Sequence, residues 1–555
     1  MNIRLNDGAA TDPVQNERDA LARSAAMQAA NAIPAFEPAV TVGYRSAGRT
    51  LVVGPAASAL PWADRLAAAM PVTALLLDEA PGGAARAYPV HGARSVAVAG
   101  WLGAFEARWQ AAGQPVGQGR FDLVLDLCAA RLIPSHQRPH GYYAPGEDEE
   151  ARARAAEELQ DMVGDFEKPK YFNYKERLCA HSRNGRQGCN ACIDICSAEA
   201  IQGDGDRIKV NPYLCAGCGA CGTVCPSGAI SYAYPPAALA GKRIQAMLRA
   251  FREAGGREPV LLLHDGGPGA AMLEELGAAM PGRLLPLGLH HMASTGIDVW
   301  LAALAYGAAG VAVLATGEEA PQYVAALDAQ MAVAQAVLDG LGYAGPHFQL
   351  LHAGALDELA LALRHAPRGE VPLEPAVFHL AADKRNTLDY ALEHLYRHAP
   401  EQPEQVPLPA GSPFGALAVD RDACSLCMAC VGACPASALQ DGQGAPLLRF
   451  IEKNCVQCGL CASTCPENAI TLVPRMSFAP SRMQAVVLNE TQPFHCIRCN
   501  KPFGTLRAVE IMLGRLAAHP AFAGHLDRLQ MCGDCRVIDM MEPEGEMRVT
   551  TLRRS

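Results

Sequence analysis

Short hydrophobic runs alternate with helical patterns in two separate parts of the chain. The runs have the length of buried strands, and stretches with helical spacing lie between them. In the first part these runs are residues 50–54, 72–78, 95–100 and 121–126, and in the second they are 259–264, 283–287, 310–315 and 347–351. The alternation predicts two small parallel α/β domains.

The later α/β region shows the pattern most fully. Residues 242–254, 296–306 and 323–341 predict helices between its strands. Pro286 interrupts one of the runs, and a proline cannot donate a backbone hydrogen bond to a neighbouring strand. We therefore expect the strand at 283–287 to lie at an edge of the sheet.

Two segments lack this alternation. Residues 1–46 predict a weakly ordered extension with a short Ala-rich helix at 21–32. Residues 366–412 are rich in Pro, Glu and Gln around one predicted helix at 387–398. This composition is typical of a linker.

The predicted fold class is multidomain α/β and α+β. Two bacterial ferredoxin-like dicluster modules are inserted between small parallel α/β domains, and a four-cysteine metal-binding domain ends the chain. The predicted domains are 1–46 (N-terminal extension), 47–165 (degenerate Rossmann-like α/β), 166–236 (dicluster module 1), 237–365 (α/β), 366–412 (linker), 413–475 (dicluster module 2) and 476–555 (four-cysteine, zinc-like).

Composition narrows the possible partners and the compartment. The 555 residues carry a net charge of −10, which argues against binding to nucleic acid or to an anionic membrane surface. No apolar run has the length that a bilayer requires, and the N-terminus does not resemble a signal peptide. We therefore expect a cytoplasmic protein without a membrane span. Of its 21 cysteines, all but Cys128 fall in metal-ligand spacings, which excludes a disulfide framework.

Module 2 contains the pattern C-x2-C-x2-C-x3-C-P twice. In bacterial ferredoxins the fourth cysteine of each half ligates the other half's cluster. One predicted 4Fe-4S cluster therefore takes Cys424, Cys427, Cys430 and Cys465, and the other takes Cys455, Cys458, Cys461 and Cys434. Two zinc sites are the alternative, but zinc does not explain eight cysteines in this doubled spacing.

Module 1 contains one complete half and one interrupted half. The complete half supplies Cys215, Cys218 and Cys221, which we pair with Cys196. The second predicted set is Cys179, Cys189, Cys192 and Cys225, with residues 181–188 inserted between its first two cysteines. The alternative is that Cys179 is a free thiol and this cluster has three irons.

Two further C-x2-C pairs lie near the C-terminus. Cys496, Cys499, Cys532 and Cys535 predict a four-thiolate zinc site, with a fifth iron–sulfur cluster as the alternative. His495 is expected to be a neighbour of this site and not a ligand.

Other features suggest chemistry less specifically. The first α/β domain lacks the glycines of a dinucleotide site after residue 54, so flavin is not expected. The adjacent His290 and His291 are interpreted as packing residues, not as a metal pair. Five aromatic residues either shield a cluster or pack between domains: Tyr142, Tyr143, Tyr171, Phe172 and Tyr174.

These motifs carry three resemblances. Residues 179–225 and 424–465 resemble bacterial dicluster ferredoxins. Residues 242–352 resemble the delta subunit of methyl-viologen-reducing hydrogenase, and the matching stretch is 296–314. No cysteine lies between Cys225 and Cys424, so the resemblance implies no cluster in this domain. The whole chain resembles bacterial 4Fe-4S proteins related to the heterodisulfide reductase electron-transfer subunit, of the kind found with formate dehydrogenases.

The sequence thus predicts a non-catalytic electron-transfer subunit of an oxidoreductase complex. It would relay electrons through four clusters between a cytoplasmic dehydrogenase and another redox carrier, and the resemblance implies formate dehydrogenase as that dehydrogenase. The alternatives are a flavin-dependent oxidoreductase subunit and a maturation factor for a metalloenzyme.

Overall fold

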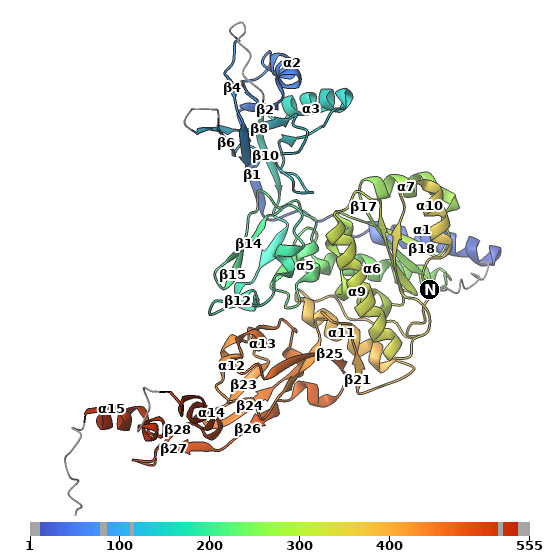
Figure 1. Ribbon diagram of the computed structural model, residues 1–555. Coiled ribbons are helices and arrows are strands. Elements are labelled where there is room, and N and C mark those ends of the chain that lie inside the picture. Colours follow the sequence, from blue (N-terminus) through green and yellow to red (C-terminus); the bar gives the residue numbers. More distant parts are fainter. Residues whose placement is uncertain (1–11, 78–85, 111–115, 520–524, 542–555) are drawn as a thin grey trace, which may run out of the picture. The chain divides into compact units, whose positions relative to one another are not determined.

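The computed structural model describes residues 12–77, 86–110, 116–519 and 525–541 (Figure 1). The end of the predicted strand 72–78, residues 1–11 of the predicted extension, and residues 520–524 and 542–555 of the predicted last domain lie outside the described residues. The chain forms two compact units. The first contains residues 1–176 and 190–402, and the second contains residues 177–189 and 403–555.

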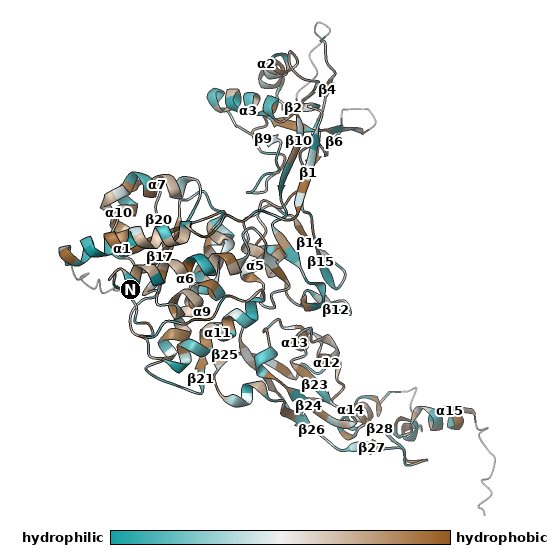
Figure 2. Cartoon of the chain, turned by 180° about the vertical axis from the view of Figure 1, so that it is seen from behind, coloured by the Kyte–Doolittle hydropathy of each residue, from teal (hydrophilic) through white to brown (hydrophobic). Residues whose placement is uncertain are grey.

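The earlier α/β part of the first unit contains a five-stranded parallel sheet. Its order is β4-β3-β2-β8-β9. The strands are β2 (Thr50–Gly54), β3 (Val72–Leu76), β4 (Val90–Gly92), β8 (Leu123–Asp126) and β9 (Tyr142–Tyr143). Helices α2 (Ala56–Leu66) and α3 (Glu149–Asp161) pack on one face. The Glu- and Arg-rich side of α3 shows as hydrophilic in Figure 2, while Ala155, Ala156 and Leu159 are buried.

The run at 95–100 does not belong to the parallel sheet, which corrects that part of the expectation. It forms β5 (Ser95–Ala99) of an antiparallel sheet with β6 (Phe105–Gln110) and β7 (Gly117–Phe121). Large and small residues alternate along β5, so only one side of the strand packs inward. Val98, Phe105 and Phe121 pack against the second face of the parallel sheet.

Residues 12–46 are ordered, although a weakly ordered extension was expected. They form α1 (Pro13–Asn31) and β1 (Thr41–Ser46), which pairs antiparallel with β10 (Gly164–Pro169). Ala22, Ala26 and Ala30 recur every four residues and are buried, so α1 packs along α6 (Ala237–Glu253) with a small-residue face. Arg23 also donates hydrogen bonds to the carbonyls of Met280 and Pro281, at 3.2 and 2.9 Å.

The later α/β part of the first unit has a four-stranded parallel sheet in the order β18-β17-β19-β20. Its strands are β17 (Val260–Asp265), β18 (Leu284–Leu289), β19 (Gly310–Ala315) and β20 (Phe348–His352). β18, with Pro286, lies at an edge, as predicted. The helices after α6 are α7 (Pro268–Leu276), α8 (Ile297–Ala305), α9 (Pro321–Gly340) and α10 (Leu356–Arg364). Of these, α7 and α10 share a core with one face of the sheet.

Residues 366–402 pack into the first unit and do not act as a spacer, which corrects the linker prediction. Helix α11 (Lys384–Arg397) lies against α8 and buries Leu388, Ala391, Leu392 and Leu395. These positions form one apolar stripe along the helix. Burial of this stripe stabilises the packed segment in spite of the Pro and Glu residues around it. The remainder, residues 403–412, contributes β21 (Gln405–Pro407) to the second unit.

The two dicluster modules repeat one plan. Module 1 pairs β11 (Phe172–Tyr174) with β16 (Ile230–Tyr232) and β14 (Ile201–Asp204) with β15 (Arg207–Val210), and it has the short helices α4 (Ala191–Asp194) and α5 (Ala220–Val224). Module 2 pairs β22 (Gly415–Val419) with β25 (Ile470–Ser477) and β23 (Leu439–Gly442) with β24 (Ala445–Phe450), and it has α12 (Ala429–Ala433) and α13 (Leu460–Thr464). Each module is therefore a pair of hairpin-like ladders with two ligand-bearing helices.

The second unit also contains an inserted hairpin and a C-terminal element. The hairpin is β12 (Ser182–Arg183) and β13 (Arg186–Gln187), and β26 (Val486–Glu490) extends the sheet of β23 and β24. The C-terminal element contains β27 (Pro493–His495), β28 (Pro502–Thr505), α14 (Leu506–Leu516) and α15 (Gly533–Met541). Short 3-10 turns lie at Glu176–Leu178, Gly277–Ala279, Met292–Ser294, Glu452–Asn454, Pro480–Met483 and Leu526–Gln530. Within the described ranges, no helix is long and apolar enough to cross a bilayer.

We predict that Leu392→Ala destabilises the first unit by about 2–5 kcal/mol, because it empties a fully buried site in α11. Anaerobic urea unfolding of the full chain, followed by circular dichroism, measures this change. Leu373→Ala is the matched control, since Leu373 is 99% exposed. If both variants unfold like the parent, α11 contributes no packing and residues 366–402 are a spacer.

Candidate metal centres

The cysteine loops are held by residues with left-handed backbone conformation. In each C-x2-C-x2-C run, the residue before the second cysteine and the residue after it have positive φ. These residues are Gly217 and Gly219, Leu426 and Met428, and Gln457 and Gly459. The conformation costs roughly 1–2 kcal/mol for a residue other than glycine. Its recurrence at Leu426, Met428 and Gln457 marks loops whose shape is set by their function.

In three halves, the sulfur of the fourth cysteine accepts a hydrogen bond from the backbone N–H of the residue four positions later. The N–H groups of Ala200, Ala438 and Ala469 donate to the sulfurs of Cys196, Cys434 and Cys465, each at 3.3 Å. The residue before each alanine, Glu199, Ser437 or Asn468, has positive φ and turns the N–H toward the sulfur. Such a bond stabilises a thiolate.

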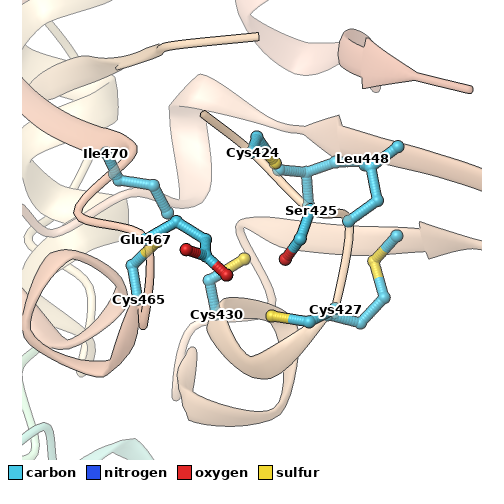
Figure 3. Close-up of a pocket in the computed structure, with 10 residues that line it drawn as sticks. Cys424, Ser425, Cys427, Cys430, Leu448, Cys465, Glu467 and Ile470 are labelled. Atoms are coloured by element: carbon cyan, nitrogen blue, oxygen red, sulfur yellow. The ribbon is translucent and has the colours of Figure 1, made fainter. Parts of the chain in front are cut away.

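Cys424, Cys427, Cys430 and Cys465 line one pocket in the second unit, with an empty volume of about 340 Å³. Figure 3 shows these cysteines around a common space, which the Glu467 side chain also borders. Cys424 and Cys427 lie in the loop after β22, Cys430 lies in α12, and Cys465 directly follows α13. The pocket therefore brings three cysteines of one half together with the fourth cysteine of the other half.

A second pocket of the same unit has the reciprocal composition. Cys434, Cys455, Cys458 and Cys461 line an empty volume of about 350 Å³. The two pockets are similar in size and exchange their fourth cysteines. This is the arrangement that two cubane clusters in a bacterial ferredoxin require.

Module 1 has a third pocket of this kind, within the first unit. Cys196, Cys215, Cys218 and Cys221 line an empty volume of about 440 Å³. Four aromatic residues complete its wall: Tyr171, Phe172, Tyr232 and Tyr323. Tyr171 and Phe172, which the sequence singled out, thus border a cysteine pocket. Tyr142, which it also singled out, instead donates a hydrogen bond to Asp126 in the first α/β domain.

The fourth predicted set divides between the units. Cys179 and Cys189 belong to the second unit, and Cys192 and Cys225 belong to the first. The assignment of this set stays a prediction from its spacing. The ligand role of the cysteines around the three pockets is likewise a prediction, which the grouping of their side chains matches.

The insertion at residues 181–188 is a tight hairpin, which the sequence interpretation treated only as a loop. Asn184 and Gly185 both have positive φ, as a two-residue type I′ turn requires. The Asn-Gly pair was the signal that could have revealed it. Within the second unit, Ala180 packs with Ala433 and Leu460, and Cys189 and Cys458 border the same small core.

Burial makes these thiols poor acids in the absence of metal. It raises the pKa of Cys430 and Cys461 to about 12 and that of Cys218 and Cys458 to about 11, and neighbouring cysteines add to the rise. Four thiolates can therefore share such a pocket only with a cationic partner. Thiolate-bound iron supplies that positive charge, so the donor sets fit an iron–sulfur cluster.

Lys168, which is buried, and Lys384, which is partly buried, bring positive charge to the backbone that carries cysteines in module 1. The Lys168 ammonium donates to the carbonyls of Tyr213 and Cys215, each at 2.8 Å. The Lys384 ammonium, at the start of α11, donates to the carbonyl of Cys225 at 3.2 Å. Burial lowers the pKa of Lys168 to about 8. An anionic cluster nearby favours the charged form of both lysines.

The C-terminal cysteines converge as the sequence predicted. The sulfurs of Cys496, Cys499, Cys532 and Cys535 all lie within 4.8 Å of one another. Although burial opposes ionisation of Cys496, backbone N–H groups of Cys532, Cys499 and Arg498 outweigh it and lower its pKa to about 6. The set could hold a metal ion or a cluster. His495 on β27 is exposed and does not belong to this group among the described residues.

The C-terminal element also fastens a ligand loop of module 2, which the sequence did not reveal. The Thr505 hydroxyl, at the N-cap of α14, donates to the carbonyl of Ser425 at 2.8 Å. Arg507 donates to the carbonyl of Asp422 at 3.0 Å, and Arg515 pairs with Glu467 at the pocket wall. Helix α14 therefore holds both sides of the pocket that Cys424 and Cys465 share.

Three side chains considered in the sequence have packing roles. His290 stacks on Tyr171, with ring centroids 5.2 Å apart, whereas His291 meets Tyr323 edge-on at 5.3 Å. The two histidines therefore contact different aromatic partners, in agreement with their interpretation as packing residues. Cys128 is half-buried beside the hydrophobic core between β5–β7 and the parallel sheet.

Comparison with known proteins identifies the class of these centres. A family model described as a 4Fe-4S dicluster domain matches residues 186–229, and another with the same description matches residues 423–470. Hydrogenase-4 component A of Escherichia coli (strain K12) is 48% identical over 40 residues, which are 7% of this chain and 20% of that protein. The chain thus spans about a fifth of the length of this curated relative.

The chain therefore contains two 4Fe-4S dicluster domains of the ferredoxin type. Domains of this description bind 4Fe-4S clusters, which agrees with the cofactor predicted from the cysteine spacing. Cys179 lies outside the matched residues, so its role rests on the sequence alone.

We predict that Cys465→Ala removes one cluster, or about four irons per chain, because it deletes one of four thiolates around a single pocket. Iron and sulfide analysis of anaerobically purified protein measures the loss. Cys128→Ala is the matched control and should keep all its iron. Equal iron contents in the two variants would contradict the assignment of Cys465.

We also predict that Gly188→Ala disturbs the inserted hairpin. An added Cβ would lie 2.5 Å from Leu460 and 2.6 Å from the carbonyl oxygen of Ala180, so the hairpin must shift. Faster loss of cluster absorbance in air and a lower melting temperature would report this shift. Gly432→Ala is the control in the same unit, because its Cβ would meet nothing within 4 Å. A Gly188→Ala protein as stable as the control would show that the contact is not needed.

Proposed function

We propose that this chain carries four 4Fe-4S clusters and relays single electrons between a dehydrogenase and another redox carrier. The observation that best supports this proposal is the grouping of three cysteine sets, each around one pocket, with fourth cysteines exchanged between halves in module 2. This grouping follows the spacing rule that also assigns the fourth set, Cys179, Cys189, Cys192 and Cys225.

Two proposed cluster ligands of the second unit border one small core. Cys189 is a proposed ligand of the fourth cluster, and Cys458 is a proposed ligand of a module 2 cluster. Both side chains pack against Ala180 and Leu460 within the second unit.

The proposed point of exchange with a partner is the loop around Cys427. Among the proposed cluster ligands in the described residues, Cys427 alone is exposed. A cluster with an exposed ligand lies nearest to a docked redox protein. Formate dehydrogenase is a proposed partner through the sequence resemblance, and the short similarity to a hydrogenase component also favours a redox complex.

The proposed C-terminal metal is zinc, in a structural role. Two C-x2-C pairs converge into a closed four-thiolate set, which is typical of structural zinc. The element that this set closes contains α14, whose contacts fasten the loop of Cys424 and Cys427. Zinc here would stabilise a cluster without carrying electrons.

We predict that the protein contains one zinc and about 16 irons per chain, counting four irons per cubane. Cys532→Ala should lose the zinc and keep the iron. The module 2 cluster next to Cys424 should then decay faster in air, because α14 no longer holds its loop. Elemental analysis and oxygen-exposure kinetics measure both effects, with the exposed Val537→Ala as control. About 20 irons in the parent, or a loss of about four irons in Cys532→Ala, would instead assign a fifth cluster.

The function is tested by anaerobic affinity purification from the native host. We expect a dehydrogenase containing molybdenum or flavin to remain bound in stoichiometric amount and to reduce the clusters when its substrate is added. A protein that comes away alone with intact clusters, or bound to an enzyme lacking its cofactor, would contradict a fixed place in a dehydrogenase complex. The latter result would favour a maturation factor.

A further inference from the structure

The later α/β part of the first unit extends a side chain to the cysteine pocket of module 1. Tyr323, in the first turn of α9, is 1% exposed and belongs to the wall of the pocket lined by Cys196, Cys215, Cys218 and Cys221. Its hydroxyl donates to the sulfur of Cys218 at 3.1 Å. A helix that carries no cysteine thus contacts a proposed cluster ligand directly.

The Tyr323 hydroxyl is held by a second buried hydroxyl, that of Ser197. Ser197 directly follows Cys196, at the position where the other three halves have proline: Pro226, Pro435 and Pro466. Proline has neither a hydroxyl nor a backbone donor. The departure from the ferredoxin pattern therefore occurs in the half whose fourth cysteine shares a pocket with Tyr323.

Packing fixes the tyrosine ring as well as its hydroxyl. His291, which follows β18, meets the ring edge-on with centroids 5.3 Å apart. A tyrosine hydroxyl has an ordinary pKa of about 10, so it keeps its proton at neutral pH. The group therefore acts as a hydrogen-bond donor toward the sulfur.

We propose that Tyr323, positioned by Ser197, is a potential-setting donor for the cluster held by Cys196, Cys215, Cys218 and Cys221. This inference rests on the proposed function, because it requires a cluster in that pocket. When the cluster accepts one electron, its thiolate sulfurs become more electron-rich, and an O–H donor stabilises that reduced form. Hydrogen bonds to sulfur are one of the means by which proteins raise a cluster's reduction potential.

The test is a potentiometric titration of the full holoprotein, with dithionite as electron donor and electron paramagnetic resonance as readout. In Tyr323→Phe we expect one cluster signal to shift to a more negative midpoint potential, while the other signals and the iron content stay unchanged. Pulsed electron paramagnetic resonance, compared in water and in deuterium oxide, should also show that Tyr323→Phe has lost one exchangeable proton coupled to that cluster.

Tyr232→Phe is the matched control. Tyr232 lines the same pocket, but its hydroxyl donates to the carbonyl of Gly217 at 2.8 Å and not to sulfur. This variant should keep both the midpoint potential and the exchangeable coupling. A shift of the same size in both variants would overturn the proposal, because it would then reflect general polarity of the pocket.

Ser197→Ala provides a second test that leaves the tyrosine in place. It should shift the same signal in the same direction by a smaller amount, because Tyr323 loses the partner that orients its hydroxyl. If Tyr323→Phe loses iron, the Ser197→Ala titration decides. Unshifted potentials with full iron in either variant would refute the role of Tyr323 and leave the relay intact, whereas a parent protein without reducible clusters would refute the relay itself.

Discussion

The structure depends on gathering four cysteine sulfurs around one point. Burial favours the neutral thiol, and neighbouring thiolates repel one another, so the cysteine pockets are unfavourable without metal. Iron–sulfur clusters reverse this balance because their iron is positively charged and binds sulfur directly. With the proposed exchange of fourth cysteines, each cluster of a dicluster module would also join the two halves of the fold. Cluster binding and folding of these modules are therefore one event.

The elements around the modules serve the same constraint. In the second unit, α14 and the inserted hairpin pack on segments that carry cysteines or border their pockets. In the first unit, α9 supplies a hydroxyl to the sulfur of Cys218, and α11 places Lys384 against the carbonyl of Cys225. The later α/β part carries no cysteine of its own and contributes the tyrosine that bears this hydroxyl. Its parallel sheet thus acts as a rigid support for groups that reach a neighbouring metal centre.

The sequence predicted the three cysteine groups that line pockets and the C-terminal group, because ligand spacing is imposed by the bound metal and hardly depends on distant packing. The edge position of β18 could be predicted from Pro286 for a similarly local reason. The fate of residues 366–402 could not, because the Pro- and Glu-rich composition concealed the buried stripe of Leu388, Leu392 and Leu395. The extension at 12–46 was misjudged since its buried face consists of alanines, which carry little hydrophobic signal. The contacts of Tyr323 and Thr505 join residues far apart in the chain, and no local pattern announces them.

The most direct test of the account is a stoichiometric reductive titration of the anaerobic holoprotein. The account predicts that each chain takes up about four electrons, one for each 4Fe-4S cluster, with progressive bleaching of the visible sulfur-to-iron absorption. A protein that binds its metals but takes up no electrons would contradict it, since the cysteine sets would then be structural zinc sites. Uptake of only two electrons in a single paired step would also contradict it, because that behaviour is typical of a flavin and not of separate one-electron clusters.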